Sequence, residues 1–214
     1  APAAEATARL VDAEGARSAV VVADVSDAGQ CSGAVAAASA ELGGLDGLVL
    51  NVGIARGARL AETSAEDWDA TFAVNVRAHF LACQAALPMM AEATAAGSPA
   101  AIVFISSVAG LKPGSRVPAY DSSKAALAGL CRHVAAEGAR KGVRANVVAP
   151  GLIDTPLGRV ASAGRPSRDR TPVPLGRMGT AWEVAEAVVW LLSDRAGYVT
   201  GQVLAVDGGL SALL

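Results

Sequence analysis

The sequence predicts an α/β fold in three layers, with helices on both faces of a doubly wound parallel sheet. Short apolar runs of strand length alternate along the chain with longer stretches of helix-forming residues. This alternation is typical of βαβ units, whose strands are parallel and whose helices cover the sheet. Turn-forming and polar residues follow the apolar runs, which marks where each strand ends.

Composition is that of one globular domain, so we treat residues 1–214 as a single unit. Apolar residues make up 52% of the chain and charged residues 18%, with a net charge of −2. A nucleic-acid-binding protein would show a basic stripe, so this balance argues against that class. No apolar run is long enough to cross a membrane and the start does not resemble a signal peptide, so we expect neither.

The cysteines and histidines stand apart from one another in the sequence. Cys31, Cys83 and Cys131 form no Cys-x-x-Cys pair, so we expect no metal site and no disulfide, and a reduced, cytoplasmic location. His79 and His133 each lie alone on a predicted helix, where a structural or exposed histidine is more common than a catalytic one.

The first half of the chain begins with the end of an amphipathic helix, closed by Gly15. A capping-box pattern, Thr63 to Glu66, opens a long helix that runs toward Met89. Between these helices we predict a strand at 18–23, a helix at 28–42 capped by Asp27 and ended by Gly43 and Gly44, and a buried strand at 48–50.

The second half contains a buried strand at 101–105, which Gly110, Pro113 and Gly114 end. Pro118 occupies the first position of the next helix, 119–140, a place that proline favours. The remaining elements are a strand at 143–149, a loop at 155–179, a helix at 181–193 and a strand at 203–206. The loop is rich in proline and glycine, and we interpret it as a mobile lid over a substrate.

Four of the predicted strands end in polar or turn-forming residues. These ends are Asp24-Val25, Asn51-Val52-Gly53, Ser106-Ser107 and Pro150-Gly151. Each one alone is explained by turn chemistry. Because open parallel sheets bind ligands beyond the carboxyl ends of their strands, the four ends together predict a ligand site on one rim.

Three side chains at this rim suit proton transfer to the oxygen of an alcohol or carbonyl. Tyr120 and Lys124 stand four residues apart on one helix, which makes them neighbours on the same face. A free tyrosine has a pKa of about 10 and is a poor base at neutral pH, so it needs a nearby positive charge. Lys124 supplies that charge, and Ser107, at the end of the preceding strand, can donate a hydrogen bond to the substrate oxygen.

These residues make the chain resemble the short-chain dehydrogenase/reductase family in its classical, single-domain, Rossmann-like branch, over essentially all 214 residues. In that family a strand-end serine, a tyrosine and a lysine form the catalytic set, and they match Ser107, Tyr120 and Lys124. An asparagine of the preceding long helix completes the set and matches Asn75. The overall similarity is to 3-oxoacyl-acyl-carrier-protein reductases and to bacterial alcohol or steroid-type dehydrogenases.

The resemblance implies a nicotinamide cofactor, NAD or NADP, which the sequence does not distinguish. The residues it assigns to that cofactor are Asp24, Val25, Asn51, Val52, Gly53, Tyr120, Lys124, Pro150, Gly151, Ile153 and Thr155. Asn51 to Gly53 fall on the family motif Asn-Asn-Ala-Gly, except that Leu50 and Val52 replace its first Asn and its Ala. The lost Asn braces the sheet in the family, so we expect Leu50 to replace it by packing.

The family's first strand, its glycine-rich turn Thr-Gly-x-x-x-Gly-x-Gly, its first helix and its second strand are absent from this sequence. In the family the two missing strands lie between the predicted strands at 18–23 and 48–50. We therefore expect about 30 to 45 further N-terminal residues in the natural protein, the length of a βαβ unit.

The predicted activity is hydride transfer that interconverts a carbonyl and a secondary alcohol, and we expect a small-molecule substrate. Its pocket is predicted to be lined by Val108, Leu111, Lys112, Arg116, Leu152 and the loop at 155–179. The resemblance implies a homodimer or homotetramer. The alternative is a catalytically silent relative that acts as a binding or structural subunit.

Overall fold

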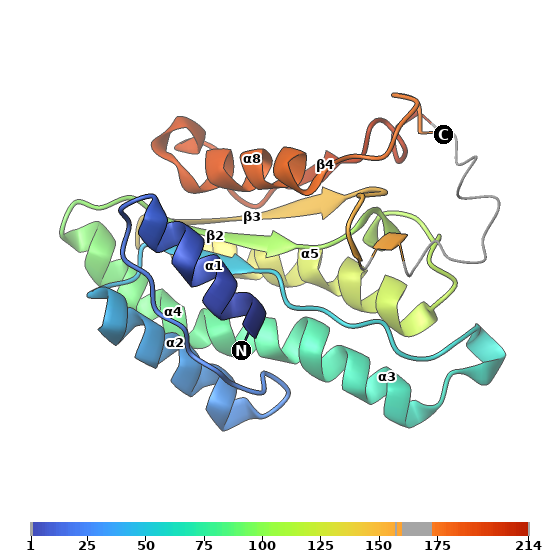
Figure 1. Cartoon of the computed structure of the whole chain (residues 1–214), viewed down its shortest axis with the longest axis horizontal. Helices are drawn as coiled ribbons and strands as arrows, with labels where there is room; N and C mark the ends of the chain where they lie inside the picture. Colours follow the sequence, from blue (N-terminus) through green and yellow to red (C-terminus); the bar gives the residue numbers. More distant parts are fainter. Residues whose placement is uncertain (1, 157, 160–172, 214) are drawn as a thin grey trace.

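A computed structural model describes residues 2–156, 158–159 and 173–213. Its centre is a parallel sheet of four strands, in the spatial order β1-β2-β3-β4 (Figure 1). The strands are β1 (Gly47–Leu50), β2 (Ala100–Ile105), β3 (Val143–Pro150) and β4 (Val203–Val206). Because all three strand pairs are parallel, the carboxyl ends of the strands lie along one rim.

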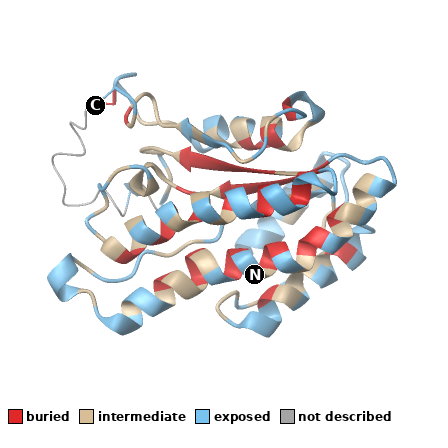
Figure 2. Ribbon diagram, turned by 180° about the vertical axis from the view of Figure 1, so that it is seen from behind, coloured by how far each residue is buried: buried red, intermediate tan, exposed pale blue. Residues whose placement is uncertain are grey.

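Helices cover both faces of the sheet, so the predicted α/β class is confirmed. The long helices are α2 (Ala28–Leu42), α4 (Ala78–Ala95), α5 (Pro118–Ala139) and α8 (Ala181–Leu192). Ile102 and Phe104 of β2 pack with α2, α4 and α5 in the larger cluster, whereas Val103 packs with α8 in the smaller one. Figure 2 shows the resulting pattern, in which β2 and β3 are buried and the helices expose their outer sides.

The long helical region predicted from Thr63 onward forms, but not as one regular helix. It comprises α3 (Ala65–Phe72), a π-helical turn (Ala73–Arg77) and α4, which runs on to Ala95. A π-turn adds one residue to the winding and is frequent at functional sites. Here it contains the fully buried Asn75. Short 3-10 turns occur at Leu60–Glu62, Val108–Gly110 and Asp194–Ala196.

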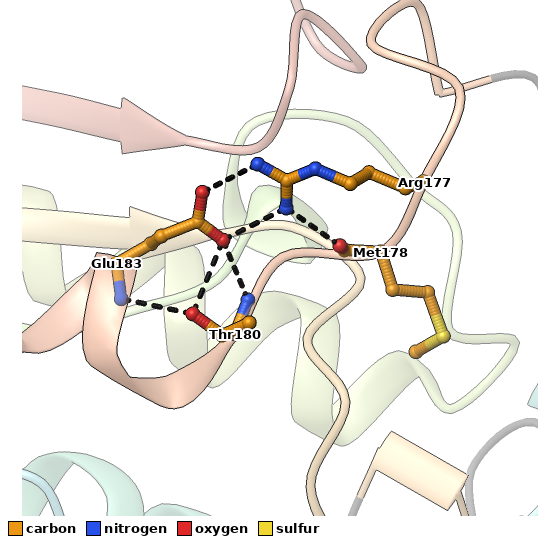
Figure 3. Close-up of polar contacts among 4 residues, drawn as sticks. All are labelled: Arg177, Met178, Thr180 and Glu183. Carbon is orange, nitrogen blue, oxygen red and sulfur yellow. Dashed lines mark hydrogen bonds and ion pairs between the residues drawn. The ribbon is translucent and has the colours of Figure 1, made fainter.

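The start of α8 is fixed by a capping box and an ion pair (Figure 3). Thr180 Oγ1 accepts from the Glu183 amide at 3.2 Å, and Glu183 Oε2 accepts from the Thr180 amide at 2.8 Å. Arg177 Nη2 lies 2.6 Å from Glu183 Oε1, and its Nη1 also donates to the Met178 carbonyl at 3.0 Å. These bonds, led by the one from Arg177, lower the pKa of Glu183 to about 2. They join the described end of the 155–179 loop to α8.

The predicted strand at 18–23 is wrong. After α1 (Pro2–Ala13) the chain runs from Ala16 to Asp24 without regular structure, and Val22 is 75% exposed. The β-branched run has no described strand beside it to complete a hydrogen-bonded ladder, and an isolated strand has no stability of its own. The segment is tied down instead by Ser18, which donates to Asp12 at 2.8 Å, and by Arg17, which donates to the Leu42 carbonyl.

None of the helices in the described ranges combines the length and apolar character needed to cross a membrane. The three cysteines are buried and unbridged. The loop predicted at 155–179 is described only at its two ends, since 157 and 160–172 lie outside the described residues.

Candidate active site

Lys124 of α5 binds the end of β2 through two hydrogen bonds, one from its side chain and one to its backbone carbonyl. The ammonium Nζ donates to the carbonyl of Ile105 at 2.8 Å, and the Lys124 carbonyl accepts from Ser106 Oγ at 2.7 Å. Gly110, in the turn that follows, comes so close to α5 that a Cβ there would lie 2.7 Å from the Lys124 carbonyl carbon. Strand end, turn and helix therefore form one packed unit around this lysine.

Ser107 follows Ser106 directly and precedes Gly110 in the chain. It begins the turn Val108–Gly110, and its Oγ accepts from the Ala109 amide at 3.1 Å. A hydroxyl that accepts one hydrogen bond still has its proton to donate. The side chain is thus held in place by the backbone and retains the donor that a substrate oxygen needs.

Tyr120 and Lys124 lie on the same face of α5, as their spacing predicts. The Lys124 Nζ is 5.7 Å from the centre of the Tyr120 ring, within the range of a cation–π contact. Tyr120 is half-buried at the first turn of the helix, and Lys124 is only 4% exposed. Burial lowers the pKa of Lys124 to about 8, so the ammonium is still mostly protonated at neutral pH.

Asn75 binds the chain segment that follows β1. Its Oδ1 accepts from the Ile54 amide at 2.8 Å, and its Nδ2 donates to the Ile54 carbonyl and to Ser123 Oγ, each at 2.9 Å. Ser123 in turn donates to the Tyr120 carbonyl at 2.8 Å. The π-turn therefore links the loop after β1 to the backbone of the helix that carries Tyr120.

His79 gives the same loop a second attachment. Its Nε2 lies 3.1 Å from the Val52 carbonyl, and because a carbonyl can only accept, the proton must be on Nε2. The side chain is 2% exposed, and Nδ1 has no hydrogen-bond partner among the described residues. Burial, followed by the nearby positive charge of Lys124, lowers the pKa of His79 to about 4. The sequence suggested a structural or exposed histidine, but only the fold shows which carbonyl it binds.

Of the residues expected to bind the cofactor after β1, Gly53 lies beside Lys124. A Cβ on Gly53 would come within 3.2 Å of Lys124 Nζ and 3.5 Å of Asn75 Oδ1, so glycine allows this close approach. Asn51 and Val52 are exposed on the rim. Leu50 is 6% exposed and belongs to the main hydrophobic cluster, which confirms that it replaces the expected asparagine by packing.

The end of β3 contributes the second half of the rim. Gly151 donates to the Val206 carbonyl at 3.0 Å, and a Cβ at this position would lie 2.7 Å from the Asp207 Cα. Ile153 forms a β-bridge with Gly179. Thr155 Oγ1 accepts from the Gly158 amide at 3.1 Å, which shapes the beginning of the following loop.

Asp24 and Val25 do not lie at a strand end, because the strand expected before them does not form. They belong to a turn before α2 in which Asp24 Oδ1 accepts from the amide and the hydroxyl of Ser26, at 2.9 and 2.7 Å. Arg77 of the π-turn donates to the Ser26 carbonyl at 2.6 Å. The turn is therefore attached close to Asn75 even without the strand.

The donor set fits the ribose and nicotinamide end of a dinucleotide. Lys124 Nζ has three protons, and the Ile105 carbonyl accepts one of them. Glycine at position 53 leaves open the space beside Nζ that a side chain would fill. Hydroxyl groups of a ribose could accept from this ammonium, and the exposed backbone at 51–52 offers further polar groups.

Comparison with known proteins identifies the family of the chain. The family model described as Enoyl-(Acyl carrier protein) reductase matches residues 1–211. The chain is 39% identical to 2-(S)-hydroxypropyl-CoM dehydrogenase 3 of Xanthobacter autotrophicus, over 98% of this chain and 83% of the relative. It is 38% identical to a 3-oxoacyl-acyl-carrier-protein reductase of Thermotoga maritima, over 88% of this chain and 75% of the relative.

Two further matches bear on activity and on cofactor. Inactive 2-(S)-hydroxypropyl-CoM dehydrogenase 2 of X. autotrophicus is 42% identical over 90% of this chain and 85% of the relative. The crystal structure of a blue fluorescent protein from a metagenomic library, in complex with NADPH, superimposes with a TM-score of 0.86. It is 36% identical, and the match covers 98% of this chain and 82% of that one. The chain belongs to the short-chain dehydrogenase/reductase family of oxidoreductases, and within it resembles the 3-oxoacyl-acyl-carrier-protein reductases.

Proposed function

We propose that this protein is an NAD(P)-dependent oxidoreductase that interconverts a carbonyl and a secondary alcohol. The observation that carries the proposal is the buried ammonium of Lys124, held against the Tyr120 ring by its bond to the Ile105 carbonyl. A phenol beside a fixed positive charge can exchange a proton with a substrate oxygen near neutral pH.

Each member of the set has a role that follows from its position. Tyr120 gives the proton to the substrate oxygen in reduction and takes it back in oxidation. The Lys124 charge stabilises the phenolate that remains after the proton has left. Ser107, whose oxygen is already fixed by the Ala109 amide, donates to the same substrate oxygen and orients it. Asn75 positions the loop after β1 relative to the tyrosine helix.

The bound nicotinamide supplies the hydride in reduction and accepts it in oxidation. Lys124 would donate to its ribose. The other residues proposed to hold the cofactor are Asp24, Val25, Asn51, Val52, Gly53, Pro150, Gly151, Ile153 and Thr155. Support comes from their arrangement, since all but the first two lie at or beyond the carboxyl ends of β1 and β3. Structural similarity to a protein that binds NADPH supports the same assignment.

The test is Tyr120→Phe, which removes only the hydroxyl. We expect this variant to lose nearly all turnover while its dinucleotide affinity stays within about a few-fold of the wild type. The chain's other tyrosine, Tyr198, is fully exposed, so Tyr198→Phe is the matched control and should retain full turnover. If Tyr120→Phe kept more than about a tenth of the wild-type turnover, the proton-transfer role would be wrong.

A second candidate function is that of a catalytically silent binding or structural subunit, because one of the relatives is named as inactive. The presence of Ser107, Tyr120, Lys124 and Asn75 in one packed site argues against it. A fluorescence titration with NADH and NADPH, combined with turnover of a panel of ketones, separates the two. Cofactor binding without turnover of any ketone would favour the silent subunit.

We also propose that the protein works as a homodimer or homotetramer in the cytoplasm, on a small-molecule carbonyl or alcohol. Trp182 and Val189, seven residues apart on the outer side of α8, are 80% and 61% exposed. Val203 on the neighbouring edge strand β4 is 36% exposed. Exposed apolar side chains on an outer helix and on an edge strand are typical of a subunit contact. Light scattering of the purified protein would measure the subunit number.

A further inference from the structure

A surface pocket of about 460 Å³ lies beside the first turn of α5 and is not used by the proton-transfer set. Its described lining residues are Arg59, Leu60, Arg116, Pro118 and Asp121. The two arginines come from loops far apart in the sequence, one after β1 and the other just before α5. The fold thus brings two arginine residues to the same hollow, next to the helix turn that contains Tyr120.

Neither guanidinium group is paired with another side chain in the described ranges. Among the described residues, the side chains of Arg59 and Arg116 take part in no ion pair and no side-chain hydrogen bond. Lys112, which the sequence places in the same region, is different because its Nζ donates to the Leu210 carbonyl at 2.6 Å. The positive charge available to a ligand is therefore that of the two arginines.

The acidic member of the pocket does not neutralise them. Asp121 Oδ2 accepts from the Gly114 amide at 3.2 Å, which holds the loop before α5. Its Oδ1 is buried and has no hydrogen-bond partner in the part of the chain that the structure describes. No contact within ion-pair distance joins Asp121 to Arg59 or Arg116 in the described structure. The described lining contains one acidic and two basic residues, which gives it an excess positive charge.

The backbone of Arg116 is strained. Its φ of 69° makes it the only residue other than glycine with a positive φ in the described part of the chain. Such a conformation costs free energy in a residue with a Cβ, and strain of this kind concentrates at ligand sites. Arg116 adopts this conformation two residues before Pro118, at the wall of the pocket.

We propose that Arg59 and Arg116 bind an oxyanion, a carboxylate or a phosphate, carried by the substrate whose carbonyl reacts at Tyr120. A guanidinium group binds such oxyanions with two parallel hydrogen bonds and cannot lose its charge at neutral pH. Asp121 follows Tyr120 directly on α5, and in the proposed binding mode the substrate's anion lies in the pocket while its carbonyl lies at the tyrosine. This inference rests on the proposed function and narrows its substrate class to anionic ketones and secondary alcohols.

The test compares ketones that differ only in charge. They are 4-oxopentanoate, its uncharged methyl ester, and 4-oxopentyl phosphate. We expect wild-type kcat/KM to be at least about tenfold higher for one of the two anions than for the ester, and the preferred anion identifies the oxyanion. In the variant Arg59→Gln/Arg116→Asn this ratio should fall to within about threefold of one, because kcat/KM for the preferred anion falls more than kcat/KM for the ester. Asparagine is chosen at 116 because it tolerates a positive φ.

Arg56→Gln is the matched control, because it removes an arginine from the same loop but does not line the pocket. It should leave the ratio at its wild-type value. An equal rate for ester and anions in the wild type, or an equal loss in Arg56→Gln, would overturn the proposal. Calorimetric titration with 4-oxopentanoate separates this inference from the activity. If the wild type binds 4-oxopentanoate and the double variant does not, but no ketone is turned over, the anion site stands and the oxidoreductase function is refuted.

Discussion

The buried histidine of α4 should make the folded protein sensitive to mild acid. His79 is neutral when folded, with a pKa of about 4, whereas an unfolded histidine titrates near 6.5. Above about pH 7 it is neutral in both states and has no effect on stability. As the pH falls below 6.5 the unfolded chain binds a proton that the folded chain does not, so the free energy of unfolding decreases until the pH reaches about 4.

The two pKa values give the size of this effect. Linkage predicts a loss of about 2 kcal/mol at pH 5 and about 3 kcal/mol at pH 4. In His79→Gln the side chain does not titrate, yet its amide can still donate to the Val52 carbonyl. The measurement is the free energy of unfolding in urea at about pH 7 and about pH 5. The fall between these two values should be about 2 kcal/mol smaller in His79→Gln than in the wild type.

The difference between wild type and variant cancels the carboxylates that titrate in the same range, since both proteins contain them. His133 lies exposed on α5, so His133→Gln is the matched control and should show the wild-type fall. The reasoning would be refuted if His79→Gln and the wild type lost stability in parallel between the two pH values. A parallel loss would mean that His79 is protonated in the folded protein.

Two further substitutions test the packing around the site. Asn75→Ala should lower the free energy of unfolding by about 2–4 kcal/mol, because it leaves the amide and carbonyl of Ile54 without partners. A loss below about 1 kcal/mol in urea unfolding would contradict this prediction. Gly110→Ala should cost about 1–3 kcal/mol and reduce turnover, because its Cβ would meet the Lys124 backbone at 2.7 Å. Gly114 has open space around it, so the control Gly114→Ala should change stability by less than about 0.5 kcal/mol. Equal losses in the two glycine variants would argue against the close contact between Gly110 and the Lys124 backbone.

The sequence alone predicted most of the sheet and the proximity of Tyr120 to Lys124. The strands at 48–50, 101–105, 143–149 and 203–206 are those of the structure within about two residues, because continuous apolar runs bounded by turn residues are local signals. The juxtaposition of Tyr120 and Lys124 also follows from local geometry, since residues four apart on a helix share a face.

The tertiary structure decided what depends on residues far apart in the chain. A strand exists only where another strand pairs with it, so the β-branched run at 18–23 remains irregular although its composition favours a strand. The carbonyl that His79 binds depends on how α4 packs against the loop after β1. The pocket of Arg59 and Arg116 likewise arises only when two loops meet. Periodicity and spacing report the conformation of neighbouring residues, whereas contacts between distant residues are fixed by the packing of the whole domain.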